Sequence, residues 1–436
     1  MIRLFLRKLF ADRAVWLLPV AGFGLTSGIG LMVFGGAMYF YTLPAAELGG
    51  VYALYATVAL ILLVVPMLAL MSSAARLLAR RRDERLSGLR LLGASSGQLR
   101  RLVIVEAGVL AAACIGCGAL LYAALLPVVG LLPFAGQPMG AGGLWLGPGL
   151  LSAAMAALLV FAAAAAFAGL RRVEVTPLGV RTRTSAQQVW RGRAVLAAGA
   201  VVVGLGVYFY APQPDMATAI VVSFVLLILP LLAVQLIGPW VLKVITRLQA
   251  RRARTPEKLI AARNVLESPQ QMWRQVGGVA VAAFVGVLAG CGMGLASTAD
   301  PQYMSPQDVL LTDDIQRGIL LTLLVAFLLT ACSVGLNQTA QILDRRELYA
   351  GLAKLGFSLS QLHRIRRLSV TRSLGAVLLV AVSCAAVVAF PVVGWAIVAA
   401  PESVATVVAV LAAGVGLVHL GTLSTRPTMR AVTLRA

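Results

Sequence analysis

The sequence predicts an all-α polytopic membrane protein with about ten transmembrane helices. Of its 436 residues, 60% are hydrophobic and only 12% are charged, whereas a soluble domain is nearer half apolar and a quarter charged. The apolar residues gather in runs of about 20, the length that a helix needs to cross the hydrocarbon of a bilayer. Lipid offers no hydrogen-bond partner to a free backbone amide, so helices are the expected form of these runs.

Ten apolar runs, rich in Ala, Val and Leu, are long enough to be transmembrane spans. In order they are 15–41, 51–75, 102–129, 149–170, 194–211, 217–242, 275–297, 318–342, 374–399 and 404–423. Of the segments that join them on the predicted outer side, the longest are the loops 130–148 and 298–319. Neither is long enough to bury a core of its own, so we expect no extracellular domain.

The distribution of charge predicts the orientation of the chain. With the N-terminus in the cytoplasm and ten crossings, every Lys and Arg except Arg317 lies on the cytosolic side. The acids left on the outer side are Glu47, Asp215, Asp300, Asp308, Asp313, Asp314 and Glu402. This positive-inside pattern predicts that both termini lie in the cytoplasm. We expect the chain in the plasma (cytoplasmic) membrane of a bacterium. Anionic membrane lipid is a sufficient partner for the net charge of +21, so we expect no nucleic acid.

A charged element between two spans occurs twice. Residues 80–101 match residues 344–364 with an offset of 263 at nine positions. The matching pairs are Glu84/Glu347, Gly88/Gly351, Leu89/Leu352, Leu92/Leu355, Gly93/Gly356, Ser95/Ser358, Gln98/Gln361, Leu99/Leu362 and Arg101/Arg364.

The surrounding spans repeat as well. Residues 1–181 and 259–436 each hold four spans and a basic exit, and 182–258 holds two linking spans and a basic linker. Both four-span units start and end inside, which makes them parallel repeats.

Each copy of the element carries a helix stop followed by a helix start. In the first, Leu89 and Leu92 have helical spacing, and Gly93 suits the left-handed position that ends a helix. Ser95-x-x-Gln98 is then a capping box that begins the next helix. The second copy repeats the stop at Gly356 and the box at 358–361. The sequence thus predicts a helix, a sharp turn and a new helix, twice.

A single copy is explained by solvated charges, leucines on the membrane face or a plain connecting turn. Two copies with matched stop and cap favour two equivalent docking places for a partner that comes as a two-fold pair. The candidate docking residues are Glu84, Leu89, Leu92, Gly93, Ser95, Gln98, Glu347, Leu352, Leu355, Gly356, Ser358 and Gln361.

Between two spans the chain carries a pattern that resembles the signature of FtsX/MacB-type ABC-transporter permeases. The pattern is E-x-x-x-L-x-x-L/xLG-A/F-S-x-x-Q-L-x-R. Residues 81–107 follow it closely, down to Glu106-Ala107. Two such units with two spans between them are similar to the ten-span BceB-like members. The resemblance implies one permease with two copies of a cytosolic ABC ATPase, which would bind the ATP and Mg; no cofactor is expected in this chain.

The sequence departs from that family pattern in places. Ser369-Val370 stands where the first copy has Glu106-Ala107, so we expect the two halves not to be equivalent. BceB-like members carry a large extracellular domain where this chain has only 298–317. Other members carry one after the first span of a unit, where this chain has the short loop 42–50. We therefore do not expect peptide sensing or lipoprotein hand-off.

Catalytic motifs are missing from the chain. It contains no G-x-x-x-x-G-K-[ST] and no H-E-x-x-H, so we expect neither an enzyme nor a metal site. The five cysteines lie in predicted spans and are expected to be small core residues. His363 is expected to be solvated or lipid-facing, and His419 to make a polar contact at a helix end.

Polar residues inside the spans are few. Gln235, Asn337, Gln338 and Gln341 are expected to form hydrogen bonds between helices. Glycines are frequent in the first and seventh spans, and we expect them to allow tight helix packing there, with a mobile seam as the alternative.

The expected function is ATP-driven export or extraction of a hydrophobic or amphipathic substrate such as a peptide, lipid or drug. The alternative is a mechanotransmission or regulatory protein that couples ATP hydrolysis to an external partner and moves no substrate itself. A secondary carrier is disfavoured, because titratable groups near the membrane midplane are scarce.

Overall fold

The computed structural model describes most of the chain. Outside the described residues lie 1–12, 45–48, 92–95, 175–191, 193–198, 200–205, 207–215, 297–304, 345–350, 352–355, 357, 391–400 and 424–436. For some stretches inside helices, among them 13–21, 75–96 and 164–174, the description is limited to the backbone.

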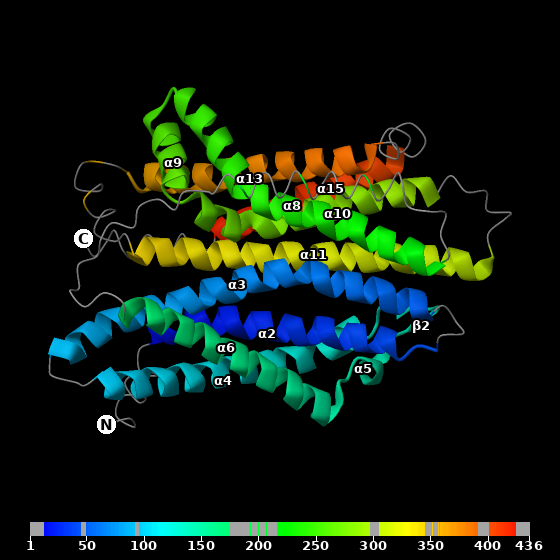
Figure 1. Ribbon diagram of the computed structural model, residues 1–436, viewed down its shortest axis with the longest axis horizontal. Helices are drawn as coiled ribbons and strands as arrows, with labels where there is room; N and C mark the ends of the chain where they lie inside the picture. The colour runs from blue at the N-terminus through cyan, green and yellow to red at the C-terminus, as the bar shows by residue number, and fades with distance from the viewer. Residues whose placement is uncertain are drawn as a thin grey trace. The chain divides into compact units, whose positions relative to one another are not determined.

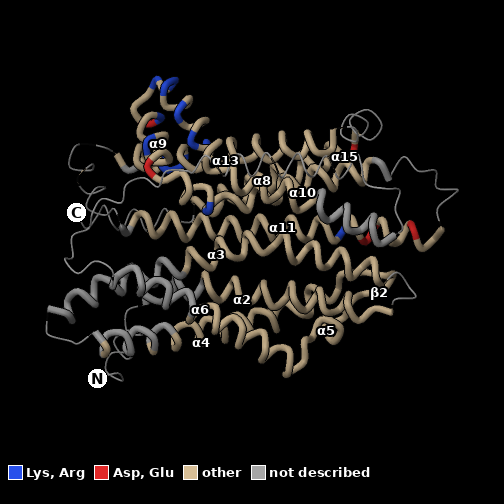
Figure 2. The backbone as a smooth tube through the Cα atoms, viewed as in Figure 1, with Lys and Arg blue, Asp and Glu red and all other residues tan. Residues whose placement is uncertain are grey.

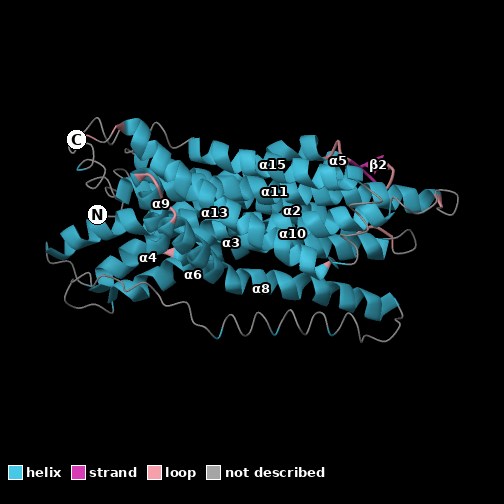
Figure 3. Cartoon of the chain, turned by 90° about the horizontal axis from the view of Figure 1, so that it is seen from above, coloured by secondary structure: helices cyan, strands magenta, loops and turns pink. Residues whose placement is uncertain are grey.

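The described residues are almost entirely helical (Figures 1 and 3). The helices are α2 Arg13–Tyr41, α3 Gly49–Leu91, α4 Ser96–Val129, α5 Gly140–Gly143, α6 Gly147–Glu174, α8 Met216–Arg251, α9 Pro256–Glu267, α10 Pro269–Ala296, α11 Pro306–Asp344, α13 Leu359–Val388 and α15 Pro401–Leu423. The strands β1 Pro133–Phe134 and β2 Gln137–Pro138 form a small antiparallel hairpin.

The all-α class predicted from the sequence is confirmed for this part of the chain. Eight of the described helices are long and apolar enough to cross a membrane, which makes the chain a multi-pass membrane protein. A further apolar stretch, Gly147–Ala163 of α6, is shorter. The fifth predicted span, 194–211, falls almost wholly outside the described residues, so the prediction of ten crossings is not tested.

The chain divides into two compact units, Met1–Arg183 and Thr184–Ala436. In the first unit, α2 packs against α3 and α4, and α6 packs mainly against α4. Small residues allow α2 and α4 to lie close together. A Cβ atom at Gly28 would come within 2.9 Å of the Gly118 carbonyl oxygen, and the Ser27 hydroxyl donates to the Cys114 carbonyl at 3.5 Å. Gly24 and Gly28 of the first span therefore serve tight packing against α4 within their own unit.

The second unit is built around α10. This helix packs against α8, α11, α13 and α15, and Val279, Ala280, Ala283 and Phe284 on it are completely buried. Small and apolar side chains around the whole helix allow neighbours on every side. The last long helices of the two units pack differently. In the second unit α15 packs on α11 and α10, whereas in the first unit α6 packs mainly on α4.

A short chain segment closes one end of the first unit. Tyr122 is fully buried, and its hydroxyl donates to the Leu144 carbonyl at 2.7 Å and accepts from the Leu146 amide at 3.0 Å. The Phe40 ring stacks on Tyr52 and meets Phe134 of the hairpin edge-on. This end, predicted to face outward, is thus capped by the backbone at Leu144 and Leu146 and by the Phe134 ring, all from the loop 130–148.

The prediction of a loop over 298–319 is wrong for its second half, since α11 begins at Pro306. Ser305 and Asp308 cap the helix reciprocally. The Asp308 carboxylate accepts from the Ser305 amide at 3.1 Å, and the Ser305 hydroxyl accepts from the Asp308 amide at 3.2 Å. Further along the helix, Arg317 pairs with Asp314 at 3.0 Å and with Asp313 at 3.8 Å. These acids support a helix rather than a solvated loop.

Candidate coupling site

The first part of the first charged element, up to Leu91, continues a transmembrane helix without a break. The helix α3 runs from Gly49 to Leu91, although its apolar stretch ends at Ala74. At 1.5 Å per residue the remainder extends about 25 Å beyond the apolar stretch. Figure 1 shows the ends of α3 and α4 projecting from the same end of the first unit. A continuous helix of this kind can carry a displacement at its tip into the span.

The predicted residues of the first copy are partly described. Glu84 and Leu89 lie in α3, and Gln98 lies in the first turn of α4. Leu92, Gly93 and Ser95 lie outside the described residues. The last residue of α3 and the first of α4 agree with a stop near position 93 and a start after position 95.

The second copy shows the predicted stop and cap. Gly356 has φ +90°, a conformation that side chains other than glycine rarely adopt, and it is exposed. The Ser358 hydroxyl accepts from the Gln361 amide at 3.3 Å, and the Gln361 side chain accepts from the Ser358 amide at 2.9 Å. This capping box starts α13. Both local predictions are confirmed, while Glu347, Leu352 and Leu355 lie outside the described residues.

A buried arginine ties α13 to α11 two turns after the cap. Arg366 is only 7% exposed and Gln338 only 3%. The Arg366 guanidinium donates to the Gln338 side-chain oxygen at 2.8 and 3.2 Å and to its backbone carbonyl at 3.1 Å. Hydrogen bonds that involve a charged group are stronger than neutral ones, so this contact holds the two helices in register.

The same helix is tied to α9 on another side. The Ser369 hydroxyl donates to the Ala261 carbonyl at 3.2 Å, and Arg372 donates to the Lys258 carbonyl at 3.5 Å. The helix α9 also packs on α8. A displacement of the turn at Gly356 would therefore be passed to α9 and α11 together with α13.

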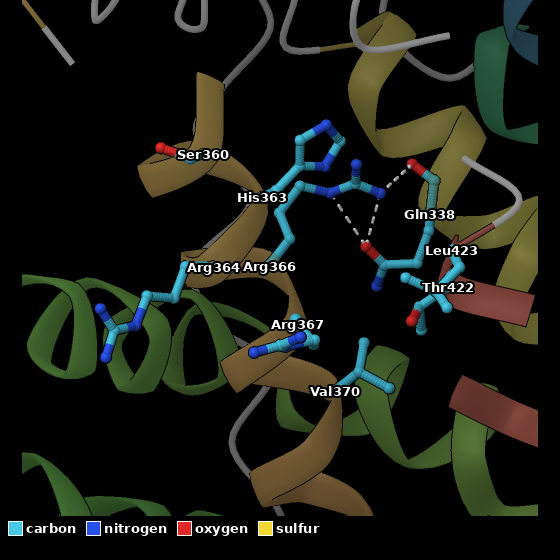
Figure 4. Close-up of a pocket in the computed structure, with 9 residues that line it drawn as sticks. All are labelled: Gln338, Ser360, His363, Arg364, Arg366, Arg367, Val370, Thr422 and Leu423. Carbon is cyan, nitrogen blue, oxygen red and sulfur yellow. Dashed lines mark hydrogen bonds between the residues drawn. The ribbon is translucent and has the colours of Figure 1, made fainter. Parts of the chain in front are cut away.

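A cavity of about 580 Å³ opens beside this connection, between α11, α13 and α15 (Figure 4). Its walls include Gln338, His363, Arg364, Arg366 and Arg367. In Figure 4 the Arg366 guanidinium points toward Gln338, and the His363 ring lies next to it. His363 was expected to be solvated or lipid-facing; it is half-buried and lines this cavity instead.

Basic residues predominate at one end of the second unit and acids at the other. Figure 2 shows mostly Lys and Arg, with some acids among them, around α9 and the adjoining end of α8, and acids beside a basic residue at the far end of α11. The coupling turn, the cap and the cavity belong to the basic end, which the sequence predicts to be cytosolic.

Two other sequence predictions about polar side chains are confirmed. Trp273 donates to Gln235 across two helices at 2.9 Å, as expected for hydrogen bonding between spans. His419 meets the Thr371 hydroxyl at 3.4 Å, the expected helix-end contact. Asn337 donates to the Ser333 carbonyl within its own helix at 3.0 Å, which does not confirm the bond between helices predicted for it.

Sequence reasoning missed Arg366 and the arginine-lined cavity. The signal was present, because Leu362, Arg366, Ser369 and Ser373 recur at helical spacing and all are buried. An arginine on such a buried helix face needs a buried hydrogen-bond acceptor, and the sequence already offered Gln338 as a polar residue within a span.

No family model matches this sequence, and neither a curated protein nor a solved structure is significantly similar to it.

Proposed function

We propose that the chain is the permease subunit of an FtsX/MacB-type ABC transporter, built from two four-span repeats and two linking spans. A separate cytosolic ATPase, in two copies, would bind ATP and Mg. The observation that carries the proposal is the capped turn of the second unit, with Gly356 at φ +90° and the Ser358–Gln361 box. Its sequence recurs at 80–101.

The turn is built to receive a force. Its shape is fixed from both sides by a left-handed glycine and a capping box, and the contacts of Arg366 and Ser369 connect it to α11 and α9. Closure of two ATPase subunits would push both turns and displace the spans attached to them. One docking turn for each of the two ATPase subunits explains why the charged element occurs twice in the sequence.

The substrate class follows from the apolar surface of the spans. The eight long helices are predominantly apolar over their described spans, which supports a cargo that enters from the lipid. We propose ATP-driven export or extraction of a hydrophobic or amphipathic molecule such as a peptide, lipid or drug.

One observation favours the mechanotransmission alternative. The helix α11 has 39 residues, Pro306–Asp344, about twice the number that crosses the hydrocarbon, and near its start Val309 and Leu310 are 46% and 44% exposed. An external partner docked on this part of the helix would receive the motion of α11 directly. In that case ATPase activity would depend on the partner protein and not on a transported molecule.

Co-purification tests the proposal first. The tagged chain, solubilised gently from its native membrane, should carry a P-loop ATPase at two copies per permease, identified and counted by mass spectrometry. A chain that purifies without any ATPase and keeps its transport activity in vesicles lacking ATP would contradict the proposal.

A double glycine variant tests the docking turn itself. Valine resists positive φ, so Gly93→Val with Gly356→Val should abolish stimulation of the ATPase while the protein still reaches the membrane. Gly375→Val is the matched control, because Gly375 lies in α13 with open space around it and an ordinary helical backbone. Unchanged stimulation in the double variant would contradict the docking role of the turns.

A further inference from the structure

The loop 130–148 of the first unit lies at the surface almost without polar side chains. Apart from Gln137 its residues are apolar or glycine, and no charged residue occurs between Glu106 and Arg171. Loops that run through water are normally rich in polar side chains. Leu131 is nonetheless 76% exposed and Trp145 is 46% exposed. Exposed apolar surface of this kind marks a contact with a membrane or with another protein.

The backbone of this loop finds hydrogen-bond partners within the protein. The strands β1 and β2 pair with each other, and the Gly140 amide donates to the Gly130 carbonyl at 2.9 Å. The buried Tyr122 hydroxyl donates to the Leu144 carbonyl and accepts from the Leu146 amide. A loop in water could leave these groups to the solvent, whereas lipid offers them no partner. The loop is therefore suited to surroundings that hold little water.

Aromatic side chains indicate a depth in the membrane for this end of the unit. Trp145, Tyr41 at the end of α2 and Tyr55 near the start of α3 are all exposed. Phe40 contacts Phe134 of the hairpin, so the end of α2 and the loop lie together. Figure 1 shows β2 and α5 at the end of the first unit opposite to the projecting ends of α3 and α4. Trp and Tyr concentrate where hydrocarbon gives way to headgroups, because each has an apolar ring and a polar group.

We propose that the loop 130–148 lies in the headgroup layer of the bilayer and contacts phospholipid through Leu131 and Trp145. Gln137 directly follows the tight turn at Ala135 and Gly136, both of which have positive φ, and it would meet the water at the tip of the hairpin. The acyl-chain region is excluded as the position of the loop, because irregular backbone exposed to lipid does not occur there.

Phospholipid fits this surface better than a protein partner does. Interfaces between proteins have a polar rim and about one hydrogen bond per 100–200 Å², and this loop offers the single polar side chain of Gln137. Because the loop joins α4 to α6, its contact with the headgroups would fix the depth of both helices in the membrane. The contact does not depend on an ATPase partner.

A fluorescent bimane label on a single introduced cysteine tests the proposal. The full-length chain is placed in phosphatidylcholine nanodiscs, with Leu131→Cys as the test position. Gln137→Cys is the matched control, because it is exposed in the same loop. The label at 131 should emit at shorter wavelength, be quenched by phosphatidylcholine that carries a nitroxide near the headgroup, and lose quenching by aqueous iodide. The label at 137 should be quenched by iodide. Wild-type protein treated alike gives the background from its five cysteines.

Trp145→Cys is a second test position. The Tyr122 hydroxyl bonds to the backbone of Leu144 and Leu146, so these two bonds do not need the indole ring, although its stacking on Tyr122 is lost. The label at 145 should give the same pattern as the label at 131. The thermal midpoint of each variant reports whether its fold is kept, and Leu131→Cys, at the more exposed position, decides the question if Trp145→Cys is destabilised.

Two outcomes would overturn the proposal. Iodide quenching at position 131 as strong as at position 137 would place the loop in water. Protection of position 131 from both iodide and the lipid nitroxide would show that protein covers the loop, whether the second unit or another chain.

Discussion

Single residues decide where the second charged element turns. Gly356 takes a left-handed backbone that a side chain would oppose by about 1–2 kcal/mol. Gly375, Gly416 and Gly292 are helical and have open space around them, so their exchange would meet no such barrier. The role of a glycine in this chain therefore depends on its backbone conformation, which its letter in the sequence does not reveal.

The pair Arg366–Gln338 gives a prediction at the same scale. In Gln338→Leu the guanidinium loses the side-chain oxygen that accepts two of its hydrogen bonds. A buried charged donor without its partner costs about 1.5–3 kcal/mol. We expect the variant to unfold at a clearly lower denaturant concentration in mixed micelles.

Gln341→Leu is the control for this variant, because Gln341 lies one turn away on α11 and is only half-buried. Similar midpoints for the two variants would show that the buried pair contributes nothing particular to stability.

At the scale of elements, helix starts follow from local chemistry. Four helices begin with proline, namely α9, α10, α11 and α15. Proline suits the first helical position, because its fixed φ is already helical and its missing N–H would have no partner there. Ser305-Pro306-x-Asp308 carried this signal for α11. The prediction of a loop there failed because the segment was assigned by its charge, while the cap was left out of account.

The cap of α13 is testable directly. Ser358→Ala removes the acceptor of the Gln361 amide, and loss of an N-cap costs about 1 kcal/mol. Amides in the first turn of α13 should exchange hydrogen faster by about fivefold, as measured by hydrogen–deuterium exchange with mass spectrometry. Ser358→Asp, which keeps an acceptor, should exchange like the wild type; faster exchange there too would argue that the hydroxyl does not act as a cap.

At the scale of the whole molecule, the prediction concerns sidedness. Gln137 is exposed in the hairpin of the first unit, and Arg252 is exposed after α8. Under the positive-inside arrangement, Gln137→Cys should react with a membrane-impermeant maleimide on intact cells, and Arg252→Cys only after permeabilisation.

The wild type is the background for this experiment, since its five cysteines lie in predicted spans. Reaction of both variants from the same side would overturn the predicted orientation.

Much of the fold was predictable from local patterns. Nine of the ten apolar runs overlap observed helices, although the run 374–399 continues past the end of α13 at Val388, and Gly356 with Ser358 and Gln361 predicted the turn of the second unit. Each of these features depends on a short stretch of chain. The backbone hydrogen bonds of a helix in lipid, the left-handed turn at a glycine and the capping box each involve only residues within one or two helical turns of each other along the chain.

Only the tertiary structure decided which helices meet. Arg366 and Gln338 are 28 positions apart, and Ser369 and Ala261 are 108 apart, so no local pattern could pair them. The different packing of α6 and α15 also followed from contacts between distant segments. The amino-acid sequence determined the helices, their caps and the segregation of charge, because these depend on neighbours along the chain. The buried arginine contact and the arginine-lined cavity arose where three helices converge, and that convergence is set by side-chain packing.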